Sequence, residues 1–295
     1  FTVAGGEANG VIPNWVSGFP VDMAFQRSIT GSEGAQITSR LMQGTSLDTS
    51  STAASYNSAS KMFDHPEGWM ASSGAASQTS WMWRRQPGFF DVVTYKGDGQ
   101  VEHEIPHSLG VAPEMMWIKQ RSAANDWRAW HSGITRKQFL CLNTDAPATS
   151  GASWPAIPTE AVFSVGAYQE VNRNGDDYIA YLFASVPGIC DIGSYTGIGP
   201  NGNTQDIDCG FTNGARFVLI KRTDSAGNWM FFDTERMIAN ISYNTLALNN
   251  TNAQIEDRNH CFALPSGFRV KGDDRDGPEW DTNISGARYI YMAIA

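Results

Sequence analysis

The stretch PGFFDVVTYKGDG, from Pro87 to Gly99, decides the fold because a second version of it follows later in the chain. From Pro187 to Gly199 the sequence reads PGICDIGSYTGIG, and six of the thirteen positions are identical. Both copies join a proline-glycine turn to a β-branched and aromatic run that ends in further glycines, a pattern typical of a strand between two turns. The chain therefore repeats a structural unit.

The match between the two copies continues downstream in the same order. The aligned segments are 117–119 (WIK) with 219–221 (LIK), Trp127 with Trp229, and 178–184 (YIAYLFA) with 289–295 (YIYMAIA). The offset grows from 100 to 102 and then to 111 residues, so the loops change length while the apolar segments keep theirs. Such self-similarity is typical of an array of autonomous units.

A fainter copy precedes these two. Residues 20–28 (PVDMAFQRS) are similar to 113–122 (PEMMWIKQRS), and 81–83 (WMW) take the place of 181–183 (YLF). We therefore predict three units, at 1–86, 87–186 and 187–295. The first is degenerate and lacks the opening strand signature.

The apolar segments indicate strands. The runs 115–118 (MMWI) and 217–220 (FVLI) are short and wholly apolar, which suits strands buried on both faces. Asn172 to Gly175 is a tight-turn sequence ahead of a closing strand. No helical period persists for 10–12 residues. We predict an all-β fold of three tandem β-sandwich units, jelly-roll-like, with Trp127 and Trp229 in their cores.

Composition excludes several classes of function. The net charge of −9 argues against a nucleic-acid partner, which needs clustered lysine and arginine. No apolar stretch approaches the ~20 residues that span a bilayer, so we expect no membrane insertion. No signal peptide is visible, and because the sequence opens on Phe1 and not on methionine we expect more sequence upstream.

The four cysteines have an internal control in the repeats. Cys190 aligns with Phe90, and Cys141 aligns with Ala247, so we expect both to be buried, reduced and apolar in character. None has the spacing of a zinc site. The alternative is a disulfide across one hairpin, Cys190 to Cys209.

Residues suited to catalysis do not recur between the units. His103 and His107 are four apart, yet a proline-containing strand fits them better than a metal-binding helix. The acidic stretch 273–277 (DDRDG) lacks both end ligands of a helical calcium loop and is better read as a hairpin tip. Asp91 and Asp191 follow Pro-Gly turns, where a turn-stabilising role is expected. We predict no catalytic residue, no cofactor and no metal site.

Three tryptophans have no counterpart in another unit. Trp15, Trp154 and Trp280 lie in stretches rich in proline, asparagine or aspartate. Exposed aromatic side chains of this kind contact sugar rings or neighbouring subunits, so we take the three as candidate interface or glycan contacts. The alternative is that each folds back on its own unit.

Several motifs resemble a known family. The stretches 90–99 (FDVVTYKGDG), 105–113 (IPHSLGVAP) and 220–229 (IKRTDSAGNW) are similar to a tandem repeat of virion proteins in tailed bacteriophages, especially phages of marine bacteria. That family belongs to tail fibres and tail-associated structural proteins, and the resemblance brings no catalytic residue. Cys209 stands at the family's histidine and Ala215 at its proline, which puts the conformations of those loops in question.

The resemblance implies a structural protein of a phage virion, in a tail fibre or another tail-surface component. We expect a homo-oligomer in contact with other virion proteins, with a host-surface glycan as a further candidate partner. Three alternatives remain: a capsid decoration protein, a carbohydrate-binding module of a secreted enzyme, and a glycan hydrolase.

Overall fold

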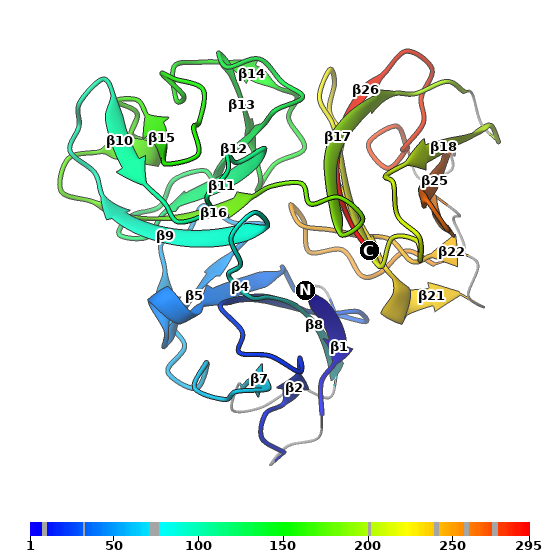
Figure 1. Cartoon of the computed structure of the whole chain (residues 1–295), viewed down its shortest axis with the longest axis horizontal. Coiled ribbons are helices and arrows are strands. Elements are labelled where there is room, and N and C mark those ends of the chain that lie inside the picture. The colour runs from blue at the N-terminus through cyan, green and yellow to red at the C-terminus, as the bar shows by residue number, and fades with distance from the viewer. Residues whose placement is uncertain are drawn as a thin grey trace.

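Three β-lobes surround a common centre in the computed structural model of the chain (Figure 1). The structure describes residues 1–7, 11–31, 33–70, 77–199, 202–238, 242–256, 260–272 and 277–295. Within these ranges the fold is an all-β sandwich architecture, with one short helix, α1 (Gln169–Asn172), and two short 3-10 turns, η1 (Arg40–Met42) and η3 (Thr234–Arg236).

Each lobe contributes one inner sheet. The first runs β1 (Thr2–Gly5), β8 (Gln78–Trp83), β3 (Met23–Ser28), β4 (Gln36–Ser39), β5 (Thr45–Asp48), β6 (Tyr56–Asn57). The second runs β9 (Phe90–Lys96), β16 (Asp177–Phe183), β11 (Met115–Gln120), β12 (Arg128–His131), β13 (Gln138–Cys141), β14 (Thr149–Ser150). The third runs β17 (Cys190–Thr196), β26 (Arg288–Ile294), β19 (Phe217–Arg222), β20 (Trp229–Asp233), β23 (Leu246–Ala247).

A smaller outer sheet completes each lobe. It pairs β2 (Trp15–Val16) with β7 (Gly68–Trp69) in the first lobe and β10 (His103–Pro106) with β15 (Val162–Val165) in the second. In the third lobe it runs β18 (Thr204–Asp208), β25 (Gly267–Lys271), β24 (Cys261–Leu264), β22 (Ser242–Tyr243), β21 (Met237–Ile238).

All three inner sheets share one strand order: an opening strand, the closing strand of the lobe, and then the strands between them in sequence. The prediction that the second and third units share their strand order is confirmed for the inner sheets, whereas the outer sheets differ, with two strands in the second lobe and five in the third. The first lobe also has an opening strand, since β1 pairs with β8 as β9 pairs with β16. The first unit thus lacks the sequence signature of this strand and keeps the strand.

The central strands are buried on both faces, as the apolar runs predict. In β19, Phe217 and Leu219 face the centre of the molecule, whereas Val218 and Ile220 face the core of the third lobe. The strand β11 alternates in the same way between the centre and the second lobe. This alternation follows from the two-residue period of a strand.

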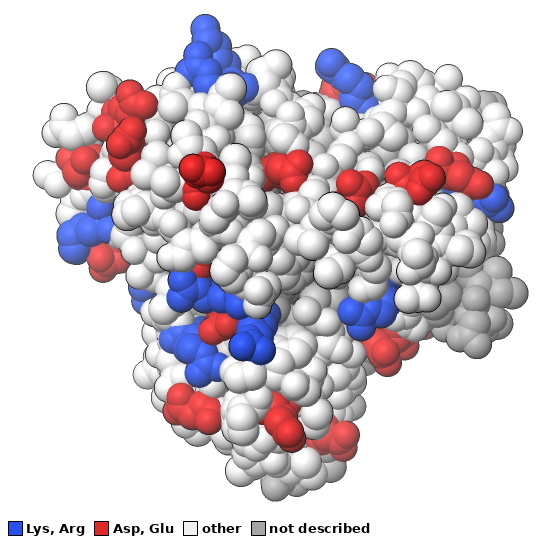
Figure 2. Space-filling model, in the orientation of Figure 1, with Lys and Arg blue, Asp and Glu red and all other residues white. Residues whose placement is uncertain are grey.

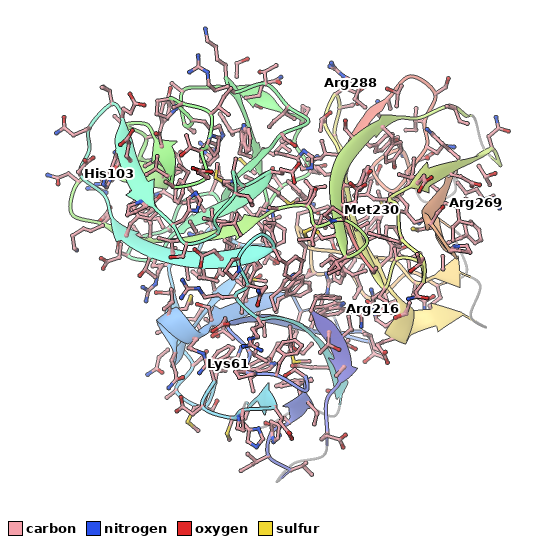
Figure 3. All side chains as sticks on the ribbon, in the orientation of Figure 1. Lys61, His103, Arg216, Met230, Arg269 and Arg288 are labelled. Atoms are coloured by element: carbon pink, nitrogen blue, oxygen red, sulfur yellow. The ribbon has the colours of Figure 1, made fainter. Side chains whose placement is uncertain are left out.

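One hydrophobic core at the centre belongs to all three lobes, and Figure 3 shows side chains filling the space between the sheets. The Trp81 ring meets the Phe231 ring edge-on at 5.0 Å between centroids, and Trp83 meets Phe183 at 6.4 Å. Both contacts cross from one lobe to another. The prediction of autonomous units is therefore wrong: an inner sheet alone would leave one apolar face in water.

A shared glycine of the repeat has a packing reason. A Cβ on Gly97 would lie 2.2 Å from the Arg173 carbonyl oxygen, and one on Gly197 would lie 2.2 Å from that of Ile284. In both lobes the end of the opening strand thus touches the loop before the closing strand. In the third lobe this loop includes the acidic stretch, of which 273–276 fall outside the described residues.

Candidate functional site

The seams between the lobes are held by the tryptophans that the repeat aligns. Trp127 and Trp229 are both buried in the central core, as predicted. The indole Nε1 of Trp127 donates to the Asp48 carbonyl oxygen at 3.0 Å, and that of Trp229 donates to the Cys141 carbonyl oxygen at 2.9 Å. Each tryptophan therefore binds the preceding lobe at the end of the fifth strand of its inner sheet, β5 or β13.

Three buried cations repeat this arrangement around the centre. They are Arg27, Lys119 and Lys221, the fifth residues of β3, β11 and β19. The ammonium of Lys119 donates to the Thr52 carbonyl at 3.1 Å, and that of Lys221 donates to the Asp145 carbonyl at 2.9 Å. Arg27 closes the ring by donating to the carbonyls of Ala247 and Asn252 in the third lobe.

Backbone bonds also cross each seam, and one of them recurs at equivalent places in all three. The recurring bonds run from the amides of Ser55, Ala148 and Gln254 to the carbonyls of Arg121 (3.0 Å), Thr223 (2.9 Å) and Ile29 (3.1 Å), respectively. Because the buried cation and this backbone bond recur at all three seams, and the tryptophan bond at two of them, the chain forms a closed ring with approximate threefold symmetry.

Burial governs the charge of these cations. Removal from water lowers the pKa of Lys221 to about 7 and that of Lys119 to about 8, and Asp145 opposes the first shift only in part. The pKa of Arg27 falls to about 10 for the same reason. Since each group points at carbonyl oxygens of a neighbouring lobe, its role is to hold the seam.

The candidate tryptophans do not come together. Trp15 is 0% exposed and stacks on Trp69 with the ring centroids 4.5 Å apart, because β2 pairs with β7. Trp154 is 2% exposed in the outer core of the second lobe. Both follow the alternative of folding back on their own unit, so neither offers a surface to a partner.

Trp280 differs because it lines an open polar hollow at the seam between the second and third lobes. It is 6% exposed, and most of its ring belongs to the outer core of the third lobe. Asn143, Thr144 and Asp145 line the hollow from the second lobe. Asn228, Asn249, Asn250, Asn252 and Glu279 line it, with Trp280, from the third. The cavity volume is about 480 Å³. Contact of Trp280 with a glycan stays a prediction.

A second hollow, of about 410 Å³, is apolar and lies at the opposite end of β19. Phe19, Phe89, Ile189 and Ile294 line it together with the guanidinium-bearing side chains of Arg84 and Arg216. Ile294, which lines the apolar hollow, pairs with Phe217 at the start of β19. Asn228, which lines the polar hollow, comes directly before Trp229, and Trp229 pairs with Lys221 near the end of β19. The polar and the apolar hollow thus lie at opposite ends of the central strand β19.

The histidines singled out in the sequence make structural contacts. The Nδ1 atom of His103 lies 3.1 Å from Asn172 Oδ1, and Nε2 of His107 lies 3.1 Å from the Thr159 carbonyl oxygen. Figure 3 shows His103 in the second lobe, far from the labelled Lys61 and Arg269 in the other two. Within the described ranges, no three histidine, cysteine or acidic side chains gather where they could hold a metal ion.

Of the two shared aspartates, Asp91 spans its Pro-Gly turn, as predicted, whereas Asp191 bonds the neighbouring strand instead. Asp91 is buried, accepts from the Ser108 amide at 2.7 Å and pairs with the Arg85 guanidinium at 2.6 Å. Asp191 accepts from the Tyr291 hydroxyl at 2.5 Å. Each carboxylate therefore ties its opening strand to a neighbouring segment.

All four cysteines lie in the described part of the chain, and all are free. Cys141 and Cys190 are buried, as their apolar counterparts predict, and the alternative disulfide from Cys190 to Cys209 is not formed. Burial raises the pKa of the Cys190 thiol well above its usual range, which keeps it protonated.

Sequence reasoning missed the buried cations and the asparagines of the polar hollow. Lys119 and Lys221 align with each other in the repeat. A lysine that recurs inside an apolar strand indicates a buried, bonded cation, and this signal could have located both residues. Asn143 and Asn249 are equivalent as well, since each accepts the backbone amide of its seam tryptophan, at 2.9 and 2.8 Å. The spacing from the tryptophan, 16 and 20 residues, differs between the copies, which hid the match.

Charged residues on the face shown in Figure 2 form small scattered groups of both signs, with the largest basic group where the lower lobe meets the others. No helix in the described ranges is long and apolar enough to cross a membrane.

Comparison with known proteins gives one family. No curated protein and no solved structure matches the chain. The family described as "Domain of unknown function (DUF7483)" matches residues 24–295, which run through all three lobes. The chain therefore belongs to the DUF7483 family.

Proposed function

We propose that the chain is a non-catalytic structural protein of a tailed-phage particle, placed in a tail fibre or another tail-surface component. The observation that carries this proposal is the closed ring of three lobes around one core, with a buried cation and a backbone bond repeated at every seam. Such a block resists local opening, because no lobe can unfold without exposing the apolar faces of the other two. The assignment to a phage particle rests on the resemblance of the repeat motifs to those of tailed-phage virion proteins.

The structural contacts of the titratable side chains support a non-catalytic role. Asp91 and Asp191 hold strands, His131 donates from Nε2 to the Tyr291 carbonyl across a seam at 3.2 Å, and the buried cations point at carbonyls. An active site usually brings a nucleophile, a base and a stabilising donor to one concave place. These residues are instead spread along the seams.

Apolar side chains in loops support contact with partners. Ile12, Val101 and Ile157 are 62%, 81% and 67% exposed. Ile12 lies beside Val11, which is exposed as well, whereas Val101 and Ile157 are single apolar residues of a kind that is also common on monomers. In an assembly they would be covered, by copies of this chain or by other particle proteins. A capsid decoration protein would use them in the same way.

A carbohydrate-binding module of a secreted enzyme is the second candidate, and the polar hollow beside Trp280 favours it. The two candidates differ in where the protein is found. Mass spectrometry of density-purified phage particles should detect the chain in a fixed ratio to the major capsid protein. Detection in the culture fluid but not in particles would support the module instead. Measurable hydrolysis of host polysaccharide by the isolated chain would refute both and favour a glycan hydrolase.

A further inference from the structure

The polar hollow beside Trp280 is built on fixed walls. The Asn228 amide donates to the Glu279 carbonyl at 2.8 Å, and the Gly227 amide donates to the Asp145 carbonyl at 2.9 Å. The Asn249 side chain donates to Asn228 Oδ1 at 2.8 Å. These bonds join two loops of the third lobe to each other and to the second lobe. The hollow is therefore formed before any ligand arrives, as is usual for binding sites.

Several polar groups in the hollow remain available. Among the described residues, the carboxylates of Asp145 and Glu279 form no ion pair, although the charge of Asp145 acts on Lys221, and the Asn252 side-chain amide has no hydrogen bond. Carboxylates accept hydrogen bonds, whereas an asparagine amide both donates and accepts. A ring of hydroxyl groups, each of which also donates and accepts, matches this mixture.

The charge and size of the hollow narrow the ligand further. No lysine or arginine side chain lines it, and its two carboxylates would repel an anion. A bare calcium ion is coordinated at 2.3–2.6 Å and needs far less room than about 480 Å³. Trp280 is 6% exposed, so an edge of its ring adds a small apolar surface to one wall, enough for a sugar to contact but not to stack on.

We propose that this hollow binds an uncharged saccharide unit of a glycan, held by Asp145, Glu279 and Asn252 against the edge of Trp280. The inference rests on the proposed particle-surface role for its biological meaning and gives that role a ligand class. Because the walls come from two lobes, a bound sugar also bridges the seam that Lys221 and Trp229 close.

The test uses the isolated full chain and nuclear magnetic resonance. The ten tryptophan indole signals and the asparagine side-chain amides report on the hollow directly. The probes are glucose, galactose, mannose, fucose, N-acetylglucosamine and N-acetylgalactosamine, each titrated to 50 mM, with calcium chloride titrated alone in a separate arm. We expect at least one sugar to shift the Trp280 indole and the amide of Asn252 in a saturable manner.

Variants then assign the contacts. Asp145→Asn with Glu279→Gln keeps the shape of the hollow and removes both charges. We expect it to weaken sugar binding by about thirtyfold, because two charge-assisted hydrogen bonds become neutral ones at about fivefold each. The matched control is Glu104→Gln with Glu160→Gln, two exposed carboxylates of the second lobe that do not line the hollow. It should bind as the unmodified chain does.

Two results would overturn the inference. One is the absence of any saturable shift at Trp280 with all six sugars. The other is a shift with calcium alone, which would assign the hollow to an ion. Neither result depends on whether a variant folds. If the chain is found in purified particles but binds no sugar, the ligand is rejected and the proposed function stands. If the chain binds a sugar but is absent from particles, the ligand stands and the proposed function is rejected.

Discussion

Replacing Trp229 by alanine tests whether the three lobes share one core. The side chain belongs to the core that all three lobes share, and its indole donates across a seam to the Cys141 carbonyl. Removing a buried tryptophan costs about 3–5 kcal/mol through lost packing and the cavity that remains. For 295 residues unfolding together, with about 2.1 cal/mol/K of unfolding entropy per residue, that cost lowers Tm by about 5–8 °C.

The seam bond can be separated from the cavity. Trp229→Phe removes the indole N–H and leaves the buried Cys141 carbonyl with only the long bond from the Thr144 amide, at 3.4 Å, so the loss costs about 1 kcal/mol beyond packing, the net value of one hydrogen bond. The control is Trp117→Phe in the same core, because the Trp117 Nε1 atom has no partner among the described residues. We expect the first variant to be the less stable by about that amount.

Differential scanning calorimetry decides between one core and three. The account predicts a single transition that moves as a whole in Trp229→Ala, with calorimetric and van't Hoff enthalpies in agreement. Two resolved transitions, of which only the smaller moves, would refute the shared core. They would restore the picture of autonomous units that the repeat alone suggests.

The remaining predictions concern charge, backbone and thiols. The folded-state pKa of Lys221 is lowered to about 7 from 10.5, so between these values unfolding takes up a proton and stability rises with pH. From pH 7 to 8.5, Lys221→Met should therefore reduce the slope of unfolding free energy against pH by about 1 kcal/mol per pH unit, as measured by urea denaturation; an unchanged slope would contradict the burial of a titrating ammonium. Gly197→Ala should destabilise the chain by about 1–3 kcal/mol because the new Cβ meets the Ile284 carbonyl, while Gly5→Ala, with open space around it, should not; equal thermal shifts would disprove the close approach. Alkylation of the denatured, unreduced chain should add four groups, one for each free cysteine, and fewer in the mass spectrum would reveal a disulfide.

Much of the secondary structure could be predicted because apolar runs and turn residues are local features of the sequence. The runs around Trp117 and Leu219 predicted strands buried on both faces, and the copied order of segments predicted a copied order of strands. An apolar run indicates that both faces of a strand are covered, but it does not indicate which segments of the chain cover them. The closure of three sheets on one another, which makes the units interdependent, therefore could not be derived from the repeat.

The features of the site were harder to predict because they depend on contacts between distant segments. Trp15 lies in a proline- and asparagine-rich stretch that suggests exposure, yet pairing of β2 with β7 buries it on Trp69. Lys119 and Lys221 have partners in loops of the preceding lobe, 67 and 76 residues away. The polar hollow likewise joins Asn143 to Asn252 only after the ring has closed.

An electron-microscopy map of the intact phage particle tests the central claim most directly. The account predicts three-lobed density of the size of this chain on the tail surface, burying more than about 1,000 Å² in total against copies of itself or other particle proteins. A complete map of the particle in which no such density can be placed would contradict a structural role in the virion.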